Sequence, residues 1–495
     1  MNVRSISYIL GWILKIEAGF MLLPVAAAVI YGETQGIAFA VTLVLCFAVG
    51  WLLSHKRPEN LSFYSKEGLI TTALCWILMS IFGCLPFVMT GEIPRFIDAL
   101  FEVVSGFTTT GASILPDVES MSHCSMLWRC FTHWIGGMGV LVFLLAVLPM
   151  VGGSNMNLMR AESPGPSVGK LVPKIRYTAR ILYSLYILLG IMQFVLLMLG
   201  GMIPFEALCT VFGTSGTGGF GFRNDSFASF SPYIQWVVTI FMILFGVNFN
   251  VYFLLMMRKA KDALRCEEMR WYFTVIAAAT LLICVNIYDS ALTLEYNLRG
   301  AAFQVASIIT TTGYATMDFD LWPTFSKTII VMLMFVGACA GSTGGGMKVS
   351  RIVMGAKAMG RFVAASLNPR SVKKIKFEDK EVDSETLHAL YIYFISVFFI
   401  FSASILLISL ENMDPTSTFT AVATTFNNIG PGLGVVGPTC NFAGLSDRSK
   451  MVLIFNMLTG RLEIFPMLLL FYPKLWKETV SQAQNRKRMR ARIHG

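Results

Sequence analysis

Four short segments combine threonine, asparagine and glycine in a pattern suited to holding a cation through main-chain oxygens. Glycine can adopt backbone angles that turn a peptide carbonyl toward a common axis, whereas β-branched neighbours stiffen the approach. Carbonyl oxygens arranged in this way can replace the hydration shell of a cation. We therefore interpret these segments as a cation filter. Its residues are Thr109, Thr110 and Gly111; Thr217 and Gly218; Thr311, Thr312 and Gly313; and Asn428, Ile429 and Gly430.

The filter glycines recur at intervals of 95 to 117 residues, which indicates an internal repeat. Each unit has an apolar span, a short amphipathic segment, the glycine motif and a second apolar span. Phe101-Glu102 and Phe303-Gln304 both precede their glycine by ten residues, which supports this alignment. The short segments cannot cross a bilayer and predict re-entrant pore helices, whose negative carboxyl ends would face the cation. In the fourth unit Asn428 and Ile429 replace a threonine pair, so we expect the ion sites to be unequal.

The elements that position these motifs follow from the composition. The 495 residues are 55% hydrophobic and only 14% charged, which excludes an ordinary soluble domain. Eight long runs contain no acidic or basic residue, and about 20 apolar residues suffice to cross a bilayer as a helix. The runs are continuous rather than alternating, which excludes a transmembrane β-barrel. They are 35–54, 69–91, 130–159, 181–204, 226–257, 271–288, 328–347 and 386–410.

We predict an all-α polytopic membrane protein with ten spans, in which four pseudo-symmetric helix–pore helix–helix repeats surround a central pore. The domains are an N-terminal transmembrane hairpin (1–60), pore repeat 1 (61–165), pore repeat 2 (166–262), pore repeat 3 with a gating loop (263–380), and pore repeat 4 with a basic C-terminal tail (381–495). We expect an uncleaved first span. Lys15 and Glu17 are expected at the membrane interface.

The net charge of +10 reflects topology rather than nucleic-acid binding. Basic residues gather in alternate connecting segments, and positively charged loops remain in the cytoplasm. Both termini are therefore expected to be cytoplasmic. The ten cysteines are expected to be buried thiols, and whether Cys124 and Cys440 pair is left open.

A glycine cluster interrupts the second span of repeat 3, where Gly341, Gly344, Gly345 and Gly346 precede Lys348. Each glycine in a helix interior costs about 1 kcal/mol relative to alanine, so we expect a broken helix. The cluster is not a nucleotide-binding phosphate loop, because Met347 separates the last glycine from the lysine. Two interpretations remain: close helix packing by small residues, or an intramembrane gating loop.

Arg461 and Glu463 lie near the middle of the last apolar stretch. Inserting an ionised arginine at a helix centre costs about 2.5–3.5 kcal/mol, so Arg461 should face a pore or a partner. The two residues are two positions apart and do not face each other on a helix. His133 is interpreted as a packing residue rather than a proton relay. We find no acid–base, nucleophilic or metal-ligand arrangement typical of an enzyme.

The four filter motifs and the span order resemble the Trk/Ktr/HKT superfamily of potassium transporters, and the layout is similar to TrkH-type membrane subunits over residues 8–472. The resemblance implies K+ uptake across the bacterial inner membrane, with no organic cofactor in this chain. Glycine at all four filter positions goes with potassium in this superfamily, whereas serine at the first position goes with sodium in some plant members. It also implies that the glycine cluster is a gating loop, and that Arg461 lines the cavity beside it.

The same resemblance implies a homodimer and a cytosolic ring of nucleotide-binding (NAD or ATP) regulatory subunits of the TrkA type. The basic connectors and tail could contact that ring or anionic membrane lipid. A sodium-selective or sodium-coupled transporter on the same scaffold is the alternative. The sequence does not separate channel-like flow from symport.

Overall fold

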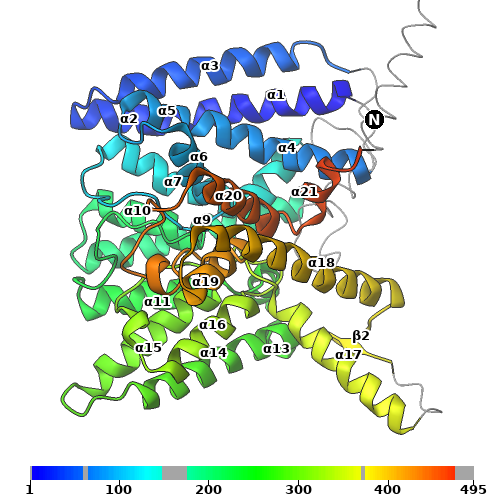
Figure 1. Cartoon of the computed structure of the whole chain (residues 1–495). Coiled ribbons are helices and arrows are strands. Elements are labelled where there is room, and N and C mark those ends of the chain that lie inside the picture. The colour runs from blue at the N-terminus through cyan, green and yellow to red at the C-terminus, as the bar shows by residue number, and fades with distance from the viewer. Residues whose placement is uncertain (1–2, 59–64, 148–174, 369–373, 474–495) are drawn as a thin grey trace, which may run out of the picture.

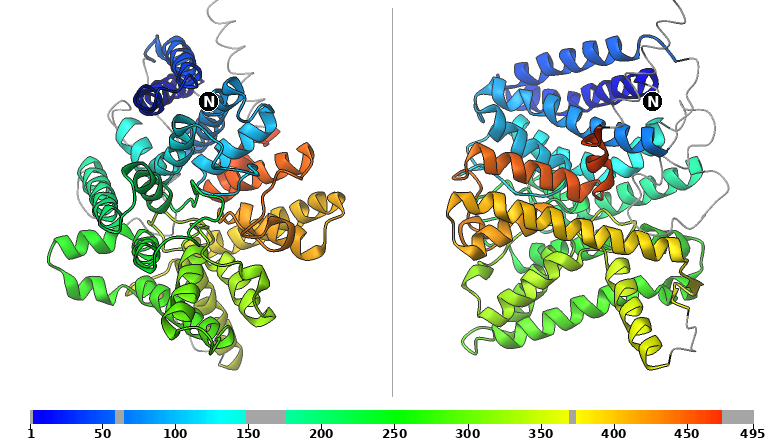
Figure 2. Two further views of the ribbon diagram at one scale, coloured as in Figure 1. Left: turned by 90° about the vertical axis from the view of Figure 1, so that its left-hand side faces the viewer. Right: turned by 45° about the vertical axis from the view of Figure 1, so that its right-hand side comes forward.

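The apolar runs of the sequence become long helices that lie roughly side by side in one bundle (Figure 1). The structure is a computed structural model, and it describes residues 3–58, 65–147, 175–368 and 374–473. An end-on view shows the helices in four groups around a centre, with the N-terminal hairpin outside them (Figure 2). The molecule therefore has the predicted class: an all-α membrane protein with four repeats and an added hairpin.

The added hairpin consists of α1 (Val3–Phe20) and α2 (Leu22–Tyr31), followed by the returning helix α3 (Gly36–Ser54). Gly11 and Gly50 let α1 and α3 approach closely, since a Cβ atom on Gly11 would lie 2.6 Å from the carbonyl oxygen of Gly50.

The interfacial position predicted for Glu17 is wrong. Its side chain is fully buried, because it continues the apolar face of α1 that begins with Ile6, Ile9 and Ile13. A Cβ atom on Gly83, the last residue of α4 (Ser65–Gly83), would lie 3.2 Å from a Glu17 carboxylate oxygen.

Four repeats follow, each with its own pore helix. Repeat 1 contains α4 (Ser65–Gly83), α5 (Leu85–Thr90), the pore helix α6 (Phe96–Phe107) and α7 (His123–Val147). Repeat 2 contains α9 (Ile175–Leu199), the pore helix α10 (Pro204–Ser215), α11 (Pro232–Phe245) and α12 (Phe249–Met256). Repeat 3 contains α13 (Ala260–Arg265), α14 (Glu267–Asn286), the pore helix α15 (Leu294–Ile309), η1 (Phe319–Leu321), α16 (Thr324–Val336) and α17 (Val349–Leu367).

Repeat 4 contains α18 (Ser384–Ile408), η2 (Ser409–Glu411), the pore helix α19 (Pro415–Phe426), η3 (Gly434–Val436), α20 (Asp447–Arg461) and α21 (Phe465–Leu470). Before it stands a two-stranded antiparallel hairpin, β1 (Lys376–Phe377) and β2 (Lys380–Glu381), in which Lys376 pairs with Glu381. The hairpin and helix α17 were not predicted, because that connector is polar and basic without a clear period. In Figure 1, α17 projects away from the bundle.

The second span of three repeats is broken near its middle. Helices α11 and α12 meet at 90°, α16 stops at Gly337, and the residues between α20 and α21 include Glu463 and Ile464 in left-handed conformations. Among the described residues, six helices are long and apolar enough to cross a membrane, or seven if the bent pair counts as one span. The break at residues 337–348 was predicted from its glycines, whereas the bend after Phe245 and the break after Arg461 were not, because hydropathy does not report where a helix breaks.

Two of the four pore helices, α15 and α19, begin with side-chain caps. The carboxylate of Asp414 accepts a hydrogen bond from the Ser417 backbone N–H at 2.9 Å, ahead of Pro415 in the first turn of α19. Hydrogen bonds from Ser417 lower the pKa of Asp414. In α15, the Thr293 hydroxyl has the same capping role. These caps satisfy backbone donors at helix starts that have no partner within the helix.

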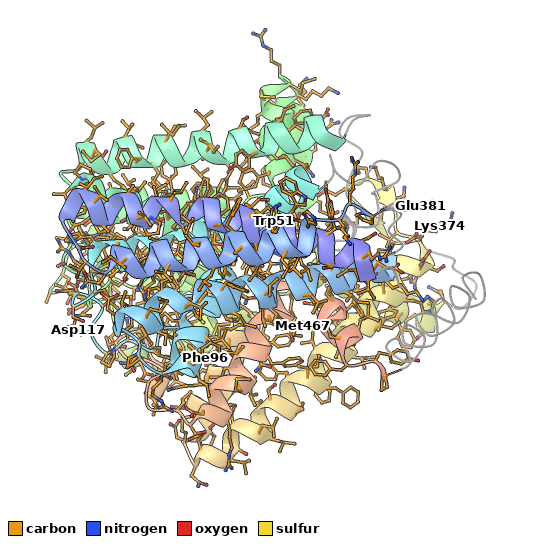
Figure 3. All side chains as sticks on the ribbon, turned by 90° about the horizontal axis from the view of Figure 1, so that it is seen from above. Trp51, Phe96, Asp117, Lys374, Glu381 and Met467 are labelled. Carbon is orange, nitrogen blue, oxygen red and sulfur yellow. The ribbon has the colours of Figure 1, made fainter. Side chains whose placement is uncertain are left out.

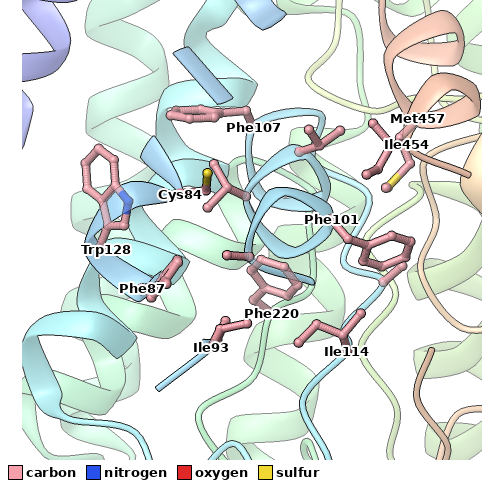
Figure 4. Packing of buried hydrophobic residues seen from close by; sticks show 14 of the residues in the cluster. Cys84, Phe87, Ile93, Phe101, Phe107, Ile114, Trp128, Phe220, Ile454 and Met457 are labelled. Atoms are coloured by element: carbon pink, nitrogen blue, oxygen red, sulfur yellow. The ribbon is translucent and has the colours of Figure 1, made fainter. Parts of the chain in front are cut away.

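A large apolar core packs around pore helix α6, where Phe101, Phe107 and Trp128 lie together (Figure 4). Within it, the Nε atom of Arg129 lies 2.6 Å from an oxygen of Glu102, and both side chains are almost completely buried. Glu102 also accepts hydrogen bonds from the Ser113 hydroxyl and the Ile114 N–H. Arg129 donates to the Gly221 carbonyl at 2.8 Å. The pair therefore fixes the chain after the first two filter segments.

Replacing Arg129 with alanine would leave the Glu102 carboxylate buried without its partner, and breaking a buried pair in this way costs about 3–5 kcal/mol. We expect Arg129→Ala to lower the midpoint of thermal unfolding of the detergent-purified protein by several degrees. Arg95→Ala is the control, because Arg95 is 59% exposed and its surface pair with Asp447 contributes about 0–1 kcal/mol. Equal midpoints for the two variants would contradict the stabilising role of the buried pair.

Candidate ion pathway

The four filter segments share one backbone conformation despite their different sequences. Each pore helix is followed by a residue in the left-handed conformation, and a glycine with positive φ stands two positions later. The residue between them donates its N–H to a pore-helix carbonyl at 2.8 Å in all four segments. The left-handed residues are Thr109, Thr217, Thr311 and Asn428, with φ of 53° to 60°. The middle residues are Thr110, Gly218, Thr312 and Ile429, and the glycines are Gly111, Gly219, Gly313 and Gly430.

The structure corrects the register of the second segment by one residue. Gly219, with φ of 76°, occupies the place of Gly111, whereas Gly218 occupies the place of Thr110. The prediction aligned each Thr-Gly pair, but the run TSGTGGFGF offers several glycines and no sequence signal for the one with positive φ. The other three segments have the predicted register.

The four segments meet around one closed ring. A Cβ atom on Gly111 would lie 2.0 Å from the Gly218 carbonyl oxygen, and one on Gly219 would lie 1.8 Å from the Thr312 oxygen. One on Gly313 would lie 2.1 Å from the Ile429 oxygen, and one on Gly430 would lie 2.9 Å from the Thr110 oxygen. Each glycine thus packs against a carbonyl of the next repeat, in the order 1, 2, 3, 4 and back to 1. This order places all four segments around a shared axis.

A second ring of contacts joins the loops that follow the filter segments. In each pair of neighbouring repeats, a backbone N–H group of one loop donates a hydrogen bond of 2.8 to 3.0 Å to an oxygen of the other loop. The acceptors are side-chain oxygens for Val118 (Asn224) and Gly434 (Asp320), and backbone carbonyls for Phe227 (Ala315) and Phe442 (Ser113). Asp117 also accepts from the Asn224 side chain at 2.7 Å, and this hydrogen bond lowers the pKa of Asp117. Figure 3 shows Asp117 at the end of the molecule opposite Lys374 and Glu381. We call these ends the loop face and the hairpin face.

The side chains of the ring are less symmetric than its backbone. Thr108 and Thr110 are joined by a hydroxyl contact of 2.8 Å, and Thr310 and Thr312 repeat it. In the fourth segment, the Asn428 amide instead donates to the Thr110 hydroxyl at 3.0 Å and to the Met457 carbonyl at 2.9 Å. The fourth segment, which was predicted to differ from the other three, therefore differs in its side chains and not in its backbone conformation.

The glycine cluster forms a loop, residues 337–348, that lies against the filter. The N–H of Gly345 donates to the Thr311 hydroxyl at 2.6 Å, and the N–H of Gly346 donates to the Asn427 carbonyl at 3.1 Å. A Cβ atom on Gly344 would lie 2.9 Å from the Thr310 carbonyl oxygen. Lys348, whose own φ is 75°, donates from its ammonium group to the Gly344 carbonyl. The cluster is thus a folded loop rather than a face for helix packing.

The break between α11 and α12 holds this loop through backbone groups. Cys339 donates its N–H to the Gly246 carbonyl at 3.1 Å, and Phe249 donates to the Gly341 carbonyl at 3.1 Å. The Thr343 hydroxyl donates to the Phe245 carbonyl at 3.2 Å. Interrupting a helix frees carbonyl and N–H groups that must find partners when water is absent. The break between α11 and α12 and the loop 337–348 therefore supply hydrogen-bond partners to each other's free backbone groups.

Arg461 ties the loop to two repeats. Its guanidinium donates to the Thr343 carbonyl at 2.9 Å and to the Gly136 carbonyl on α7 at 2.7 Å. Glu463 pairs instead with Arg351 at the start of α17, whose guanidinium lies over the Tyr393 ring at 4.2 Å. The contact between Arg461 and the Thr343 carbonyl agrees with the expectation that this residue lies beside the glycine cluster. The pairing of Glu463 with Arg351 had no sequence signal, because the two residues are distant in the chain.

His133 has both ring nitrogens engaged by backbone groups: Nδ1 lies 2.8 Å from the Gly106 carbonyl, and Nε2 accepts from the Phe220 N–H at 3.1 Å. This geometry matches the interpretation as a packing residue.

All ten cysteines are free thiols, and Cys124 is buried whereas Cys440 is exposed. Within the described part of the chain, no group of three or more His, Cys, Asp or Glu side chains could hold a metal ion.

Four repeats that close a glycine-lined ring inside a helical membrane fold define a pseudo-tetrameric membrane pore protein. The chain belongs to the TrkH family of cation transport proteins, whose family model matches residues 35–480.

Similar proteins cover the whole chain. The Trk system potassium uptake protein TrkH of Salmonella typhimurium is 38% identical over 97% of this chain and all of its own length. Its counterpart in Escherichia coli K12 is 37% identical over the same shares. The crystal structure of the potassium transporter TrkH from Vibrio parahaemolyticus superposes with a TM-score of 0.87, at 32% identity, over 96% of this chain and all of that chain.

Alanine at Gly313 would be strained by its φ of 87°, at about 1–2 kcal/mol, and would also collide with the Ile429 carbonyl. Alanine at Gly430 meets a weaker overlap, at 2.9 Å. We expect the midpoint of thermal unfolding to fall most for Gly313→Ala and less for Gly430→Ala. Gly360→Ala, on an open face of α17, should not lower it. A different order would contradict the ring contacts as the reason for glycine.

Proposed function

We propose that this protein takes up potassium ions across the bacterial cytoplasmic membrane, through the ring formed by the four filter segments. The closed order of glycine–carbonyl contacts is the observation that carries the proposal, because it brings four equivalent backbones around one axis. The names of the relatives, all potassium uptake proteins or transporters, support the choice of ion. The membrane potential would drive entry at about 2.3 kcal/mol per charge for each 100 mV.

In this proposal the carbonyl oxygens of the middle residues, with those of the neighbouring filter residues, replace the hydration shell of the ion. Glycine at positions 111, 219, 313 and 430 supports potassium over sodium, because in the superfamily that the chain resembles glycine in all four filter segments goes with potassium. The ligand residues proposed here include all those predicted from the sequence, with Gly219 added. They differ in side chains, so the sites need not bind equally well.

The loop 337–348 is the proposed gate. It lies directly against the filter residue Thr311 and against Asn427 at the end of pore helix α19, so an ion that leaves the filter on this side must displace it. Arg461 adds a positive charge beside the loop and a hydrogen bond to it. Opening would require the loop and Arg461 to exchange these contacts for water.

Basic residues gather at the hairpin face, including Lys374 before β1, Lys376 in β1 and Lys380 in β2. The tendency of basic loops to remain in the cytoplasm supports a cytoplasmic hairpin face and cytoplasmic termini. The C-terminal tail lies outside the described residues. No organic cofactor is needed for the proposed transport.

A homodimer and a TrkA-type ring of NAD- or ATP-binding subunits are also proposed. The projecting helix α17 supports protein partners, because Met359, Phe362, Val363 and Leu367 form one exposed apolar face on it, each more than half exposed. Anionic lipid is the further proposed contact of the basic segments.

The test is complementation of a bacterium that lacks potassium uptake, grown at low external potassium, with and without a candidate regulatory subunit. We expect growth to be restored with the subunit. Flux competition between potassium and sodium in proteoliposomes then separates the proposal from its alternative, a sodium-selective or sodium-coupled transporter. Preferential sodium uptake would overturn the assignment.

Serine at Gly111 would place a side chain against the Gly218 carbonyl. We expect Gly111→Ser to lower the ratio of potassium to sodium uptake by about tenfold, equivalent to about 1.4 kcal/mol. Gly91→Ser is the matched control, because Gly91 has the same φ of 78° but no neighbour within 4 Å of an added Cβ. An unchanged ratio in Gly111→Ser would count against the role of the ring in selection.

Alanine at Arg461 would remove both the positive charge and the hydrogen bond to Thr343. We expect Arg461→Ala to increase the rate of potassium uptake per molecule in proteoliposomes, because the loop loses an anchor and the ion meets less repulsion. Arg448→Ala is the control, since Arg448 is exposed on the same helix α20. If the uptake rate and its dependence on the regulatory subunit were both unchanged in Arg461→Ala, the barrier role would fail.

A further inference from the structure

One buried carboxylate holds both ends of the loop 337–348. Glu268 lies in the first turn of α14, on the hairpin-face side of the molecule, and is only 3% exposed. Its Oε1 atom accepts a hydrogen bond from the Ala340 N–H at 2.6 Å and another from the Ser350 N–H at 3.2 Å. Ala340 lies within the loop and Ser350 lies just beyond it, so a single oxygen joins the two flanks.

The other oxygen of Glu268 faces the break between α11 and α12. It accepts from the side-chain amide of Asn248 at 3.4 Å. The Oδ1 atom of Asn248 caps α12 through the Asn250 N–H at 3.0 Å and lies 3.1 Å from where a Cβ on Gly341 would stand. Glu268 therefore connects the loop to repeat 2 and repeat 3 at once.

The start of α14 is itself held by the hairpin between β1 and β2. Glu378, at the turn of this hairpin, accepts from the Glu268 N–H at 3.0 Å and from the Cys266 thiol at 3.1 Å. Glu378 and Asp379 both have left-handed backbone conformations, as a two-residue hairpin turn requires. A continuous chain of hydrogen bonds thus runs from the surface hairpin to the loop.

We propose that Glu268 is a positioning residue for the gate: its carboxylate holds the loop 337–348 against the filter, and the hairpin keeps that carboxylate in place. The proposal rests on the proposed function of the loop as a gate. The carboxylate accepts two N–H groups in a buried site, where leaving a donor without its acceptor is costly. Removing the carboxylate would leave both N–H groups without their acceptor and free the loop.

The native Cys339 reports the position of the loop. Its side chain is fully buried, so it should react with a thiol reagent only when the loop leaves the filter. Cys209, equally buried in pore helix α10, reports general loosening of the protein instead. The experiment measures the rate of N-ethylmaleimide labelling of each cysteine, by peptide mass spectrometry, on the full chain in lipid vesicles. Potassium flux is measured in the same vesicles.

We expect Glu268→Ala to raise the labelling rate of Cys339 by about tenfold or more, because the N–H groups of Ala340 and Ser350 both lose their acceptor, and to raise potassium flux. Labelling of Cys209 should not change. Glu268→Gln should give a smaller rise, because the amide oxygen can still accept from Ala340 and Ser350. Glu267→Gln is the matched control: the neighbouring carboxylate pairs with Lys357 at 2.5 Å and should leave Cys339 as in the wild type.

The proposal is overturned if Cys339 labelling in Glu268→Ala stays at the wild-type rate, if Cys209 labelling rises with it, or if flux stays unchanged while the wild type transports potassium. Should the wild type carry no potassium, the proposed function fails first. The labelling result then decides separately whether Glu268 holds the loop.

Discussion

The close contact between each filter glycine and a carbonyl of the next repeat constrains the rest of the molecule. Such an approach leaves no room for a Cβ atom, so the four segments pack main chain against main chain. Two surrounding helices make the same kind of contact. A Cβ atom on Gly136 of α7 would lie 1.9 Å from the Phe107 carbonyl oxygen, and one on Gly460 of α20 would lie 1.9 Å from the Phe426 carbonyl oxygen, each at the end of the pore helix in the same repeat. The second spans therefore press directly on the pore-helix ends, and the buried pair of Arg129 and Glu102 fixes the chain that leaves the ring.

Three of the four second spans are interrupted, and an interrupted helix frees backbone groups. Inside a membrane those groups need protein partners. The break at Gly246 supplies carbonyls to the loop 337–348, and the loop supplies a carbonyl to the N–H of Phe249. The loop 337–348 is therefore held by hydrogen bonds that the interrupted helices must form in any case.

The fold class could be predicted because long apolar runs and four recurring glycine motifs are strong sequence signals. The interruption at residues 337–348 was also accessible, since its glycines disfavour a helix. Features that depend on three-dimensional contact were missed: the register of Gly219, the 90° bend after Phe245, the burial of Glu17 and the partner of Glu463. In each case the deciding contact involves residues far apart in the chain, and the local sequence of TSGTGGFGF or of α1 is compatible with either outcome.

Joining four repeats in one chain permits an asymmetry that four identical subunits cannot have. The filter backbone is nearly equivalent in all repeats, because its glycines and left-handed residues recur. Away from it, each repeat differs: repeat 3 contributes the loop, repeat 4 contributes Arg461, and repeats 2 and 3 contribute the groups that hold the loop. Four identical loops converging on one axis would collide, whereas a single loop fits among the three repeats that lack it. The repeats therefore differ mainly in the loop 337–348 and in the groups that contact it. The filter backbone keeps nearly the same conformation in all four repeats.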